Sequence, residues 1–503
     1  MRAQSCAKRE SKLSQFRQPR ALSEILDLYY GEVTVRVRNR EEYLATFSIE
    51  NFGCRATQAD AAAIERQLRS SGLARVVEHS QAEIVVLNTC TVTAAADSQA
   101  RDTIRHIHAA NPRARILVSG CYAQRAPEEL AMLEGVEWVV GNSHLAEIPG
   151  LLSDLIQNPV AVPVARSFSL IPVAALSAGE MSLARGPAKI LTSDIFSQSA
   201  VLTGPASGED GQHTRPTLKI QDGCNHRCSY CVIPFVRGNS RSLAPDQVVD
   251  EVRSLIAAGA REIVLSGINL GSYGRDLSPR ASLESVLRSI LDETPLERLR
   301  LSSIEPMDVT EDLLKFVASE PRIAQHLHMP LQSASNSILH AMHRWYRAEH
   351  YERRIELIRE FLPDAAIGAD VLVGFPDETK EDFEATRAFI ERLPFAYLHI
   401  FSFSPRPGTA AANLPNPVAP SEIRARARQL RALSAQKAAE FRATQSRRPL
   451  RALTLNRQGA DWTESLTGNY LKVKIPGRHP ANQWHQAEIT AEGLSSVGVP
   501  AGI

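Results

Sequence analysis

Three cysteines directly follow a short apolar run in the segment Thr217-Leu-Lys-Ile220-Gln-Asp-Gly-Cys224-Asn-His-Arg-Cys228-Ser-Tyr-Cys231. The run Thr217–Ile220 is predicted to be a β-strand, and the cysteines have the spacing C-x3-C-x2-C. Three thiolates within eight residues can bind three irons of a 4Fe–4S cluster. The fourth iron then has no protein ligand, so that a small molecule can coordinate it. We therefore expect an iron–sulfur cluster on the loop after this strand.

A zinc knuckle is the alternative for these cysteines. Its fourth ligand would be His226 or a residue distant in the sequence. Zinc commonly uses paired C-x2-C or C-x4-C elements, and no second pair is present in the chain. The spacing therefore favours the iron–sulfur cluster over zinc.

Short apolar runs alternate with helical patterns throughout residues 216–440. Such alternation is typical of a parallel sheet covered by helices. The six predicted strands are too few to close an eight-stranded barrel, so we predict an open, partial (β/α)6 barrel with its chemistry at the C-terminal strand ends. The predicted strands are Thr217–Ile220, Ile263–Leu265, Leu299–Ser302, His326–Met329, Ile367–Val373 and His399–Phe403.

Residues 46–156 show the same alternation and are predicted to form an α/β domain with a parallel sheet. Cys54, Cys90 and Cys121 each come after a predicted strand. Because the C-terminal ends of parallel strands share one edge of a sheet, we expect these cysteines to lie together and to hold a second cluster. The alternative is three buried, inert thiols. The predicted strands are Phe47–Ile49, Ile84–Leu87, Ile116–Val118 and Trp138–Val140.

The rest of the chain lacks this regular pattern at its beginning and in its middle. Residues 1–45 form a basic extension, and residues 157–215 are rich in Pro, Gly and Ser and are predicted to be a linker or insertion. Cys6 has no partner and receives no role. No segment has the features of a targeting signal or a membrane span, so we expect a cytoplasmic protein with no membrane partner.

The net charge of +1 conceals a basic region near the C-terminus. Ten basic residues lie between Ser421 and Ala460 against two acidic ones, and strand-like runs then predict a small β-barrel in residues 441–503. Basic residues beside a small β-barrel with exposed aromatic rings favour RNA binding, whereas a solvated helix is the alternative. Tyr470, Trp462 and Trp484 could supply the rings. The candidate RNA-binding residues are Arg447, Arg448, Arg451, Lys472 and Lys474.

Several motifs together resemble one family. The cysteine segment resembles the radical S-adenosylmethionine (SAM) superfamily and, more narrowly, the methylthiotransferases, over residues 46–155 and 215–495. Thr57 and Ala334 depart from the family pattern, which usually has Asn and Gly there. The matching segments are Gln221–Pro234 with Arg237-Gly238, Asn88-Thr-Cys90-Thr-Val-Thr93, Ser119-Gly-Cys121, His328-Met-Pro-Leu-Gln332-Ser and Val373-Gly-Phe-Pro-Asp-Glu-Thr379.

The resemblance implies an enzyme with two 4Fe–4S clusters, SAM, and a C-terminal RNA-binding β-barrel of the kind called TRAM. One cluster would be held by Cys224, Cys228 and Cys231 and would cleave SAM to a radical that abstracts hydrogen from carbon 2 of a modified adenine. The other would carry the sulfur that a second SAM methylates. The resemblance also implies an electron donor of the flavodoxin or ferredoxin type, and leaves the sulfur donor unidentified.

Three branches of this family differ in substrate. They act on threonylcarbamoyladenosine in the tRNA anticodon stem-loop, on isopentenyladenosine in tRNA, or on an aspartate of a ribosomal protein. The segments Asn88–Thr93, Gly267–Gly274 and Leu301–Pro306 resemble the threonylcarbamoyladenosine branch. A non-catalytic RNA-binding protein with structural zinc is the alternative from another class.

Candidate SAM contacts are placed by their positions near the predicted cluster loop and strand ends. They are Tyr230, Gly267, Glu305 and Gln332. Each also has a purely structural interpretation: Tyr230 as a plug, Gly267 as a turn, Glu305 as a helix cap and Gln332 as a polar loop residue. Histidines such as His326 and His328 are interpreted as core or loop residues rather than ligands, and no catalytic side chain is predicted beyond the cluster ligands.

Overall fold

The computed structural model describes residues 45–152, 187–202, 214–488 and 499–500. These ranges belong to one compact unit of the chain, which runs from residue 44 to residue 503. The predicted extension over residues 1–45 and most of the predicted linker over 157–215 lie outside the described residues.

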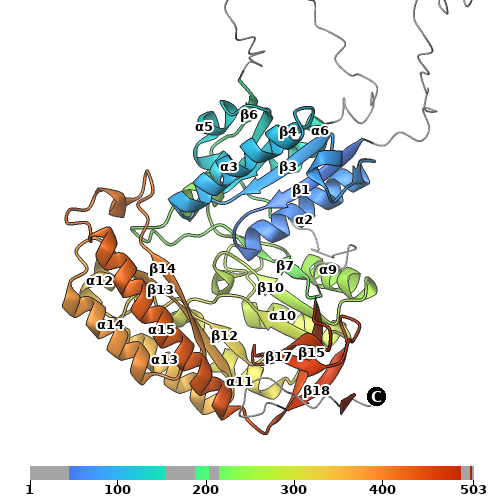
Figure 1. Ribbon diagram of the computed structural model, residues 1–503. Coiled ribbons are helices and arrows are strands. Elements are labelled where there is room, and N and C mark those ends of the chain that lie inside the picture. The colour runs from blue at the N-terminus through green and yellow to red at the C-terminus, as the bar shows by residue number, and fades with distance from the viewer. Residues whose placement is uncertain (1–44, 153–186, 203–213, 489–498, 501–503) are drawn as a thin grey trace, which may run out of the picture. The chain divides into compact units, whose positions relative to one another are not determined.

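The N-terminal part is a six-stranded parallel sheet with the strand order β2-β1-β3-β4-β5-β6 (Figure 1). Its strands are β1 (Thr46–Asn51), β2 (Ala74–Arg75), β3 (Ile84–Thr89), β4 (Arg115–Gly120), β5 (Val136–Gly141) and β6 (Lys189–Leu191). Its helices are α2 (Arg55–Ser70), η1 (His79–Gln81), α3 (Ala94–Ala110), α4 (Cys121–Arg125), α5 (Pro127–Ala131), η2 (Asn142–Glu147), α6 (Ile148–Leu151) and η4 (Ile195–Ser197).

The alternation of side chains along β3 explains why this sheet is covered on both faces. Val85 and Leu87 belong to one apolar cluster, which includes residues of α3, while Ile84 and Val86 belong to another, which includes residues of α2. A strand that is buried on both faces appears in the sequence as a continuous apolar run, and this run is the basis on which β3 was predicted. The predicted parallel sheet is confirmed.

Strand β6 lies inside the range that the sequence analysis assigned to a linker or insertion. It pairs in parallel with β5, with Trp138 opposite Lys189, and forms the edge of the sheet. Its three residues lie between segments rich in Pro, Gly and Ser, so no apolar run of strand length was visible. Residues 187–202 therefore include part of the N-terminal sheet.

The central part contains six parallel strands in two three-stranded sheets, β11-β10-β7 and β12-β13-β14. Isolated bridges pair Leu299 with Ile323 and Ser303 with His328, so the two sheets continue into each other. The predicted partial barrel is confirmed. Its strands are β7 (Thr217–Lys219), β10 (Glu262–Ser266), β11 (Arg298–Leu301), β12 (His326–His328), β13 (Ala366–Val373) and β14 (Tyr397–Ser402).

Helices and short connecting elements separate these strands (Figure 1). The helices are α8 (Ile233–Arg237), α9 (Pro245–Ala257), η5 (Leu270–Ser272), α10 (Leu283–Glu293), η6 (Pro306–Asp308), α11 (Glu311–Ser319), α12 (Asn336–Ala341), α13 (Ala348–Phe361), α14 (Lys380–Arg392), η7 (Ala410–Asn413) and α15 (Pro420–Thr444). A two-stranded antiparallel ribbon is formed by β8 (Gln221–Asp222) and β9 (Arg241–Ser242).

The two faces of the barrel strands differ in polarity. Apolar side chains such as Ile263, Leu299 and Ile367 lie in one large core together with residues of the surrounding helices. The register places Glu262 beside Arg298 and His328 beside Gly368 on the opposite face. We call this opposite face of the six strands the lumenal face. It is polar, so the inside of the barrel is not a hydrophobic core.

The C-terminal part is a five-stranded antiparallel sheet with the order β17-β16-β15-β18-β19. Strand β16 was not among the strands predicted from the sequence, because its residues Trp462-Thr-Glu-Ser-Leu-Thr467 are largely polar. Helix α15, which precedes the sheet, ends at Thr444, a few residues beyond the predicted domain boundary at 440. The strands are β15 (Pro449–Gln458), β16 (Trp462–Thr467), β17 (Lys472–Pro476), β18 (Trp484–Glu488) and β19 (Val499–Pro500).

The C-terminal sheet contacts the N-terminal ends of the barrel strands. Arg298, at the start of β11, donates to the backbone oxygen of Arg451 at 2.7 Å, and Arg300 of the same strand donates to the backbone oxygens of Thr467 and Gly468, both at 2.9 Å. His326, at the start of β12, stacks on Tyr470 with ring centroids 4.2 Å apart. The end of the barrel opposite the predicted cluster loop is thus closed by this sheet.

Among the described helices, none combines the length and the apolar character that crossing a membrane requires.

Candidate functional site

The first cysteine triplet lies on the loop between β8 and α8, as the sequence predicted. Gly223 begins the loop with a positive φ of 70°, and a Cβ there would lie 2.0 Å from the backbone oxygen of Asn239. The amide of Cys224 donates to the oxygen of Gly238 at 3.0 Å. A residue without Cβ therefore lets the two ends of the loop close, and Cys228 and Cys231 lie between them.

The three thiols are near one another and receive hydrogen bonds. Burial, together with the neighbouring Cys228 and Cys224, raises the pKa of Cys231 to about 12. The amide of His226 donates to Sγ of Cys224 at 3.4 Å, and Arg344 donates to Sγ of Cys228 at 3.4 Å. Thiols with such raised pKa values need a cation to become thiolates, and N–H donors stabilise the anionic sulfur. This donor set fits an iron–sulfur cluster.

The second triplet gathers at the C-terminal edge of the N-terminal sheet. Cys54 follows β1, Cys90 follows β3 and Cys121 begins α4 directly after β4. Gly53 has a φ of 111°, and a Cβ there would lie 2.6 Å from Cβ of Cys90 and 3.0 Å from its Sγ. Because Gly53 adjoins Cys54, the loop after β1 lies against Cys90. The expected proximity of these cysteines is therefore present in the fold.

The electrostatics of the second triplet resemble those of the first. Burial, together with the neighbouring Cys121 and Cys54, raises the pKa of Cys90 to about 12. Asn142 donates its amide to Sγ of Cys121 at 3.5 Å, while its Oδ1 is buried without a hydrogen-bond partner among the described residues. Thr57 donates to the backbone oxygen of Cys54 at 2.7 Å and so fixes the start of α2. Three converging thiols with an unsatisfied polar atom nearby fit a bound metal cluster.

Helix α8 connects the two triplets. Val232, the residue after Cys231, and Val236 form a small apolar cluster with Cys121. Asn142, which contacts Cys121, also donates to the backbone oxygen of Val236 at 2.8 Å. The element that ends one cysteine loop thus packs directly on a cysteine of the other, and the two sites are adjacent.

A buried charge network holds the two domains in this arrangement. Arg237 donates to Asp60 of α2 at 2.7 Å and to Asp222 at 3.1 Å. Lys219 of β7 contacts Asp60 and donates to Asp222 at 2.8 Å. Although burial raises the pKa of Asp222, Lys219 and Arg237 bring it below its ordinary value, so the carboxylate is charged. Arg241 also lies 3.6 Å from Asp222, so two carboxylates and three basic side chains form one buried charge network between α2 and the start of the barrel.

We expect the Asp60→Asn variant to lose about 3–5 kcal/mol of unfolding free energy, because it leaves the buried Lys219 and Arg237 with too little negative charge. Urea unfolding of the metal-free protein, followed by fluorescence, measures the change. Arg253→Ala is the control, since Arg253 pairs with Glu293 at the surface and its loss should cost less than about 1 kcal/mol. Equal losses in both variants would contradict the structural role of Asp60.

The candidate SAM contacts lie around the first triplet with different surroundings. Glu305 forms an ion pair with Arg344, the residue that also donates to Cys228. Gly267 is close to Gln221, since a Cβ there would lie 2.8 Å from Oε1 of that residue. Glu305 is thus linked to Cys228 of the first triplet through one guanidinium, a connection that the sequence did not reveal.

The other two candidate contacts are Gln332 and Tyr230. Gln332 has a φ of 62°, and its backbone donates to Asp370 and accepts from Leu372. Tyr230 is half-buried and packs in a small apolar cluster with residues such as Phe375, in agreement with the plug interpretation. Binding of SAM by these four residues stays a prediction.

The candidate RNA-binding residues all lie at the surface of the C-terminal part, but most have partners within the chain. Arg448 pairs with Asp364, Arg451 donates to Glu297 at 2.6 Å, and Lys472 contacts Glu464 at 3.5 Å. Lys474 lies over the ring of Trp462 at 4.2 Å, and Arg447 has a φ of 62°. Their role in binding RNA stays a prediction.

The expected exposed aromatic rings are present only in part. Trp484 is buried and donates its indole N–H to Glu297 at 2.6 Å, and Tyr470 stacks on His326. Trp462 is half-buried. The expectation that Trp484 offers an exposed ring is therefore wrong, because this ring packs against the barrel.

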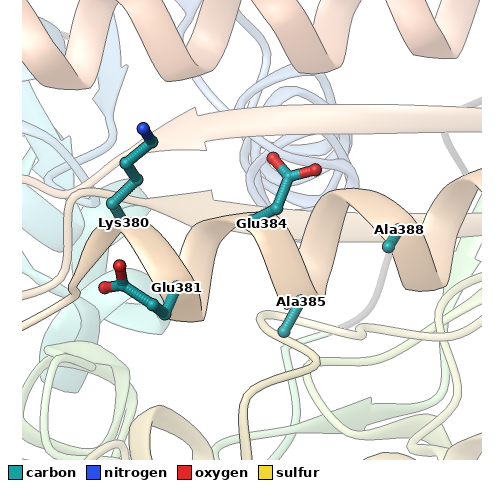
Figure 2. Close-up of a pocket in the computed structure, with 5 residues that line it drawn as sticks. All are labelled: Lys380, Glu381, Glu384, Ala385 and Ala388. Carbon is teal, nitrogen blue, oxygen red and sulfur yellow. The ribbon is translucent and has the colours of Figure 1, made fainter.

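Two surface hollows of similar size differ in the chemistry of their lining residues. One, of about 410 Å³, is lined only by residues of α14, and Figure 2 shows that they all belong to this one helix. It contains no cysteine and has a mixed set of charged and alanine side chains. The other, of about 390 Å³, is lined by residues of the first triplet loop, such as Cys228 and Cys231, and of η7, such as Asn413. The chemistry therefore favours the second.

Two family models match the chain. The model described as "Uncharacterized protein family UPF0004" matches residues 46–141, and the model of the Radical SAM superfamily matches residues 218–390. The first range contains Cys54, Cys90 and Cys121, and the second contains Cys224, Cys228 and Cys231. The two matches thus coincide with the two cysteine sites.

The chain is similar to curated proteins over most of its length. A threonylcarbamoyladenosine tRNA methylthiotransferase, MtaB, of Aquifex aeolicus (strain VF5) is 35% identical over 86% of this chain and 96% of the relative. Its counterpart from Bacillus subtilis (strain 168) is 33% identical over 86% of this chain and 91% of the relative. A tRNA-2-methylthio-N(6)-dimethylallyladenosine synthase of Thermobifida fusca (strain YX) is 33% identical over 75% of this chain and 71% of the relative.

Among solved structures, the chain is similar to the radical S-adenosylmethionine methyltransferase TsrM from Kitasatospora setae, with cobalamin and a 4Fe–4S cluster bound. The TM-score is 0.52 at 18% sequence identity, over 74% of this chain and 77% of that one. At this identity the similarity concerns the fold alone.

Proposed function

Since the chain belongs to the family of radical SAM methylthiotransferases, we propose that it adds a methylthio group to carbon 2 of N6-threonylcarbamoyladenosine next to the anticodon of tRNA. Two adjacent cysteine triplets, joined by the packing of Val232 and Val236 on Cys121, are the observation that carries the proposal. Methylthio transfer needs one site that activates the C–H bond and another that delivers sulfur. A tRNA substrate would place the enzyme in the cytoplasm, as the sequence predicts.

The first site would hold a 4Fe–4S cluster on Cys224, Cys228 and Cys231, and SAM beside it. When bound, these groups supply the electron transfer and the carbon radical that remove a hydrogen atom from an aryl C–H, which side-chain bases are too weak to deprotonate. Arg344 keeps a positive charge beside Cys228 and orients Glu305 through their ion pair. Glu305 is thereby positioned to accept hydrogen bonds from SAM.

The second site would hold another 4Fe–4S cluster on Cys54, Cys90 and Cys121, with an open iron position for the sulfur to be transferred. Asn142 and the loop at Gly53 hold the three thiols in place. Since α8 packs on Cys121 of the second triplet, a sulfur held at the second site would lie on the side of the sheet that adjoins the first site.

The C-terminal sheet would bind the tRNA as a TRAM-like domain. Arg447, Arg448, Arg451, Lys472 and Lys474 are the candidates for phosphate contacts, and the ion pairs of Arg448, Arg451 and Lys472 with carboxylates would have to open for these three to bind phosphate. An acidic one-electron carrier of the flavodoxin or ferredoxin type would deliver electrons to the first cluster, and the sulfur donor is unidentified.

Analysis of tRNA nucleosides by mass spectrometry tests the substrate. In a strain that lacks the gene, we expect threonylcarbamoyladenosine to lose its methylthio group entirely, while methylthiolated isopentenyladenosine keeps its normal level. Re-expression of the gene should restore the modification. Loss of the methylthio group from isopentenyladenosine instead, or from a ribosomal-protein aspartate, would contradict the proposed substrate in favour of the two other branches of the family.

A further inference from the structure

The lumenal face of β12–β14 carries a row of polar and aromatic side chains. The strand register places His328 beside Gly368, and Asp370 beside His399, on the same face. The intervening residues, such as Ile367 and Leu398, lie on the other face in the large apolar core. The row consists of His326, His328, Asp370, Tyr397, His399 and Phe401.

Five of these six side chains form one hydrogen-bonded group, in which His326 contacts Tyr397 and the trio of His328, Asp370 and His399 lies beyond it. Nε2 of His328 lies 2.9 Å from Oδ1 of Asp370, and Nδ1 of His399 lies 3.2 Å from the same oxygen. The other nitrogen of His328 lies 3.1 Å from the hydroxyl of Tyr397. Tyr397 lies across Gly368, where a Cβ would be 2.2 Å from its ring. The group is therefore held in a fixed geometry by the strand backbone.

Exposure increases along the row toward the C-terminal ends of the strands. His326 and His328 are buried, but the side chain of His399 is 56% exposed and Phe401 is 44% exposed. The side chain of Asp370 is 23% exposed, which is between the values of the two buried histidines and that of His399. A ligand that enters from the end of the barrel with the cluster loop can thus reach Phe401 first and then His399 and Asp370.

The spacing of this accessible part fits a modified purine. Phe401 offers a ring for stacking against a base, and His399 lies two residues away on the same strand face, about 7 Å along the strand. This separation is comparable with the reach from a purine ring to the polar groups on a short N6 substituent. Nε2 of His399, which donates or accepts according to the protonation of the ring, and the carboxylate of Asp370, which accepts, match a substituent that carries both carbonyl or carboxylate oxygens and N–H or O–H groups.

The opposite side of the lumen is also polar. The strands β7, β10 and β11 place Lys219, Ser266 and Arg300 on the lumenal face, and Glu262 pairs with Arg300 at 2.7 Å. Apolar side chains on the lumenal face include Val264 in the middle of β10 and Leu372, which pairs with Phe401 near the end of β13. A hydrocarbon substituent that pointed past Phe401 would thus meet charged and polar groups. It would also displace water from His399 and Asp370 without offering them hydrogen bonds in return.

We propose that His399 and Asp370, the latter oriented by His328, bind the polar N6 substituent of the substrate adenosine while Phe401 packs against its base, so that these residues select threonylcarbamoyladenosine over isopentenyladenosine. The inference rests on the proposed function, since it assigns the selection of that substrate to one wall of the same barrel. His399 and Asp370 touch the substituent, and His328 is a positioning residue that orients Asp370.

The test uses the reconstituted full-length enzyme with two stem-loop RNAs that carry threonylcarbamoyladenosine or isopentenyladenosine. We expect the wild type to prefer the first by at least about 100-fold in kcat/KM, since a site built for hydrogen bonds rejects an analogue that lacks them. His399→Leu should reduce this preference at least about tenfold, mainly through KM for the first RNA. His399→Gln, which keeps an N–H donor, should restore part of it, and Asp370→Asn should also weaken it.

His106→Leu is the matched control, because His106 is exposed on α3 and should leave the preference unchanged. Iron content and thermal midpoint verify that each variant is folded. A wild type that prefers isopentenyladenosine contradicts the proposed function and the inference together. A wild type with the expected preference, which persists in both His399→Leu and Asp370→Asn, contradicts the inference alone.

His328, Asp370 and His399 offer atoms within 4.8 Å of one another, so a divalent metal ion is the alternative occupant of this group. Metal analysis of the protein without its iron–sulfur clusters separates the two cases. One equivalent of zinc or manganese bound by the wild type and lost in His399→Leu would overturn the inference. The absence of such binding, with the substrate preference altered in the variant, supports it.

Discussion

Cys228→Ala is expected to reduce SAM cleavage to the background of the metal-free protein. The variant removes one of three thiolates from the loop that Gly223 closes, and two cysteines cannot retain the open-site cluster that SAM needs. It also leaves Arg344, which donates to Cys228 at 3.4 Å, beside Glu305 without its sulfur partner. The measurement is the formation of 5′-deoxyadenosine and methionine by the anaerobically reconstituted protein with dithionite.

The control for this experiment is Cys6→Ala, because Cys6 is the cysteine to which the sequence assigns no role. It should cleave SAM at the wild-type rate. Full cleavage by Cys228→Ala would show that the first cluster is held by other residues. Because a folded but inactive variant is required for the conclusion, circular dichroism of both variants accompanies the assay.

The strands that carry the cysteines could be predicted because burial on both faces leaves a clear pattern. The residues of β3, Ile84–Thr89, are all buried, and their apolar run is visible in the sequence. The position of Cys90 at the end of β3 followed from that run and from the rule that parallel strands end at a common edge. The proximity of Cys54, Cys90 and Cys121 could therefore be predicted from the sequence alone.

The contacts that join the domains could not be predicted in the same way. Asp60 and Arg237 are 177 residues apart, and both read as ordinary surface charges in the sequence. Arg344, which lies between Glu305 and Cys228, is likewise one of many arginines. Charged residues reveal partners only when the fold brings them together, because the local sequence pattern carries no information on which pairs are buried.

The basic C-terminal region shows a further limit of composition. Arg426 counted toward the predicted RNA-binding charge, yet it is buried and donates to Glu378 at 2.6 Å. The polar strand β16 was missed because its side chains do not alternate clearly between apolar and polar. Both errors arise where tertiary contacts, rather than local pattern, determine the environment of a side chain.

We expect Cys90→Ala to separate the two halves of the reaction: SAM cleavage at the first site continues, and methylthio transfer to RNA stops. The reason is geometric, since Cys90 lies against the loop of Gly53 and near Cys54 and Cys121, while it contributes no ligand to the loop of Cys228. Product analysis of a threonylcarbamoyladenosine stem-loop by mass spectrometry, together with 5′-deoxyadenosine measurement, gives both rates from one reaction.

Iron content makes the same assignment without relying on activity. Two 4Fe–4S clusters correspond to about eight irons per wild-type chain, and either Cys90→Ala or Cys228→Ala should retain about four. Stoichiometric zinc without iron would instead favour a non-catalytic RNA-binding protein. Val232, directly before α8, packs on Cys121 and so joins the two sites. The iron retained by Cys90→Ala therefore also shows whether the first cluster is stable when the second site is empty. If Cys90→Ala retained full methylthio transfer, the thiols beside Gly53 would not be the ligands of the sulfur-carrying cluster.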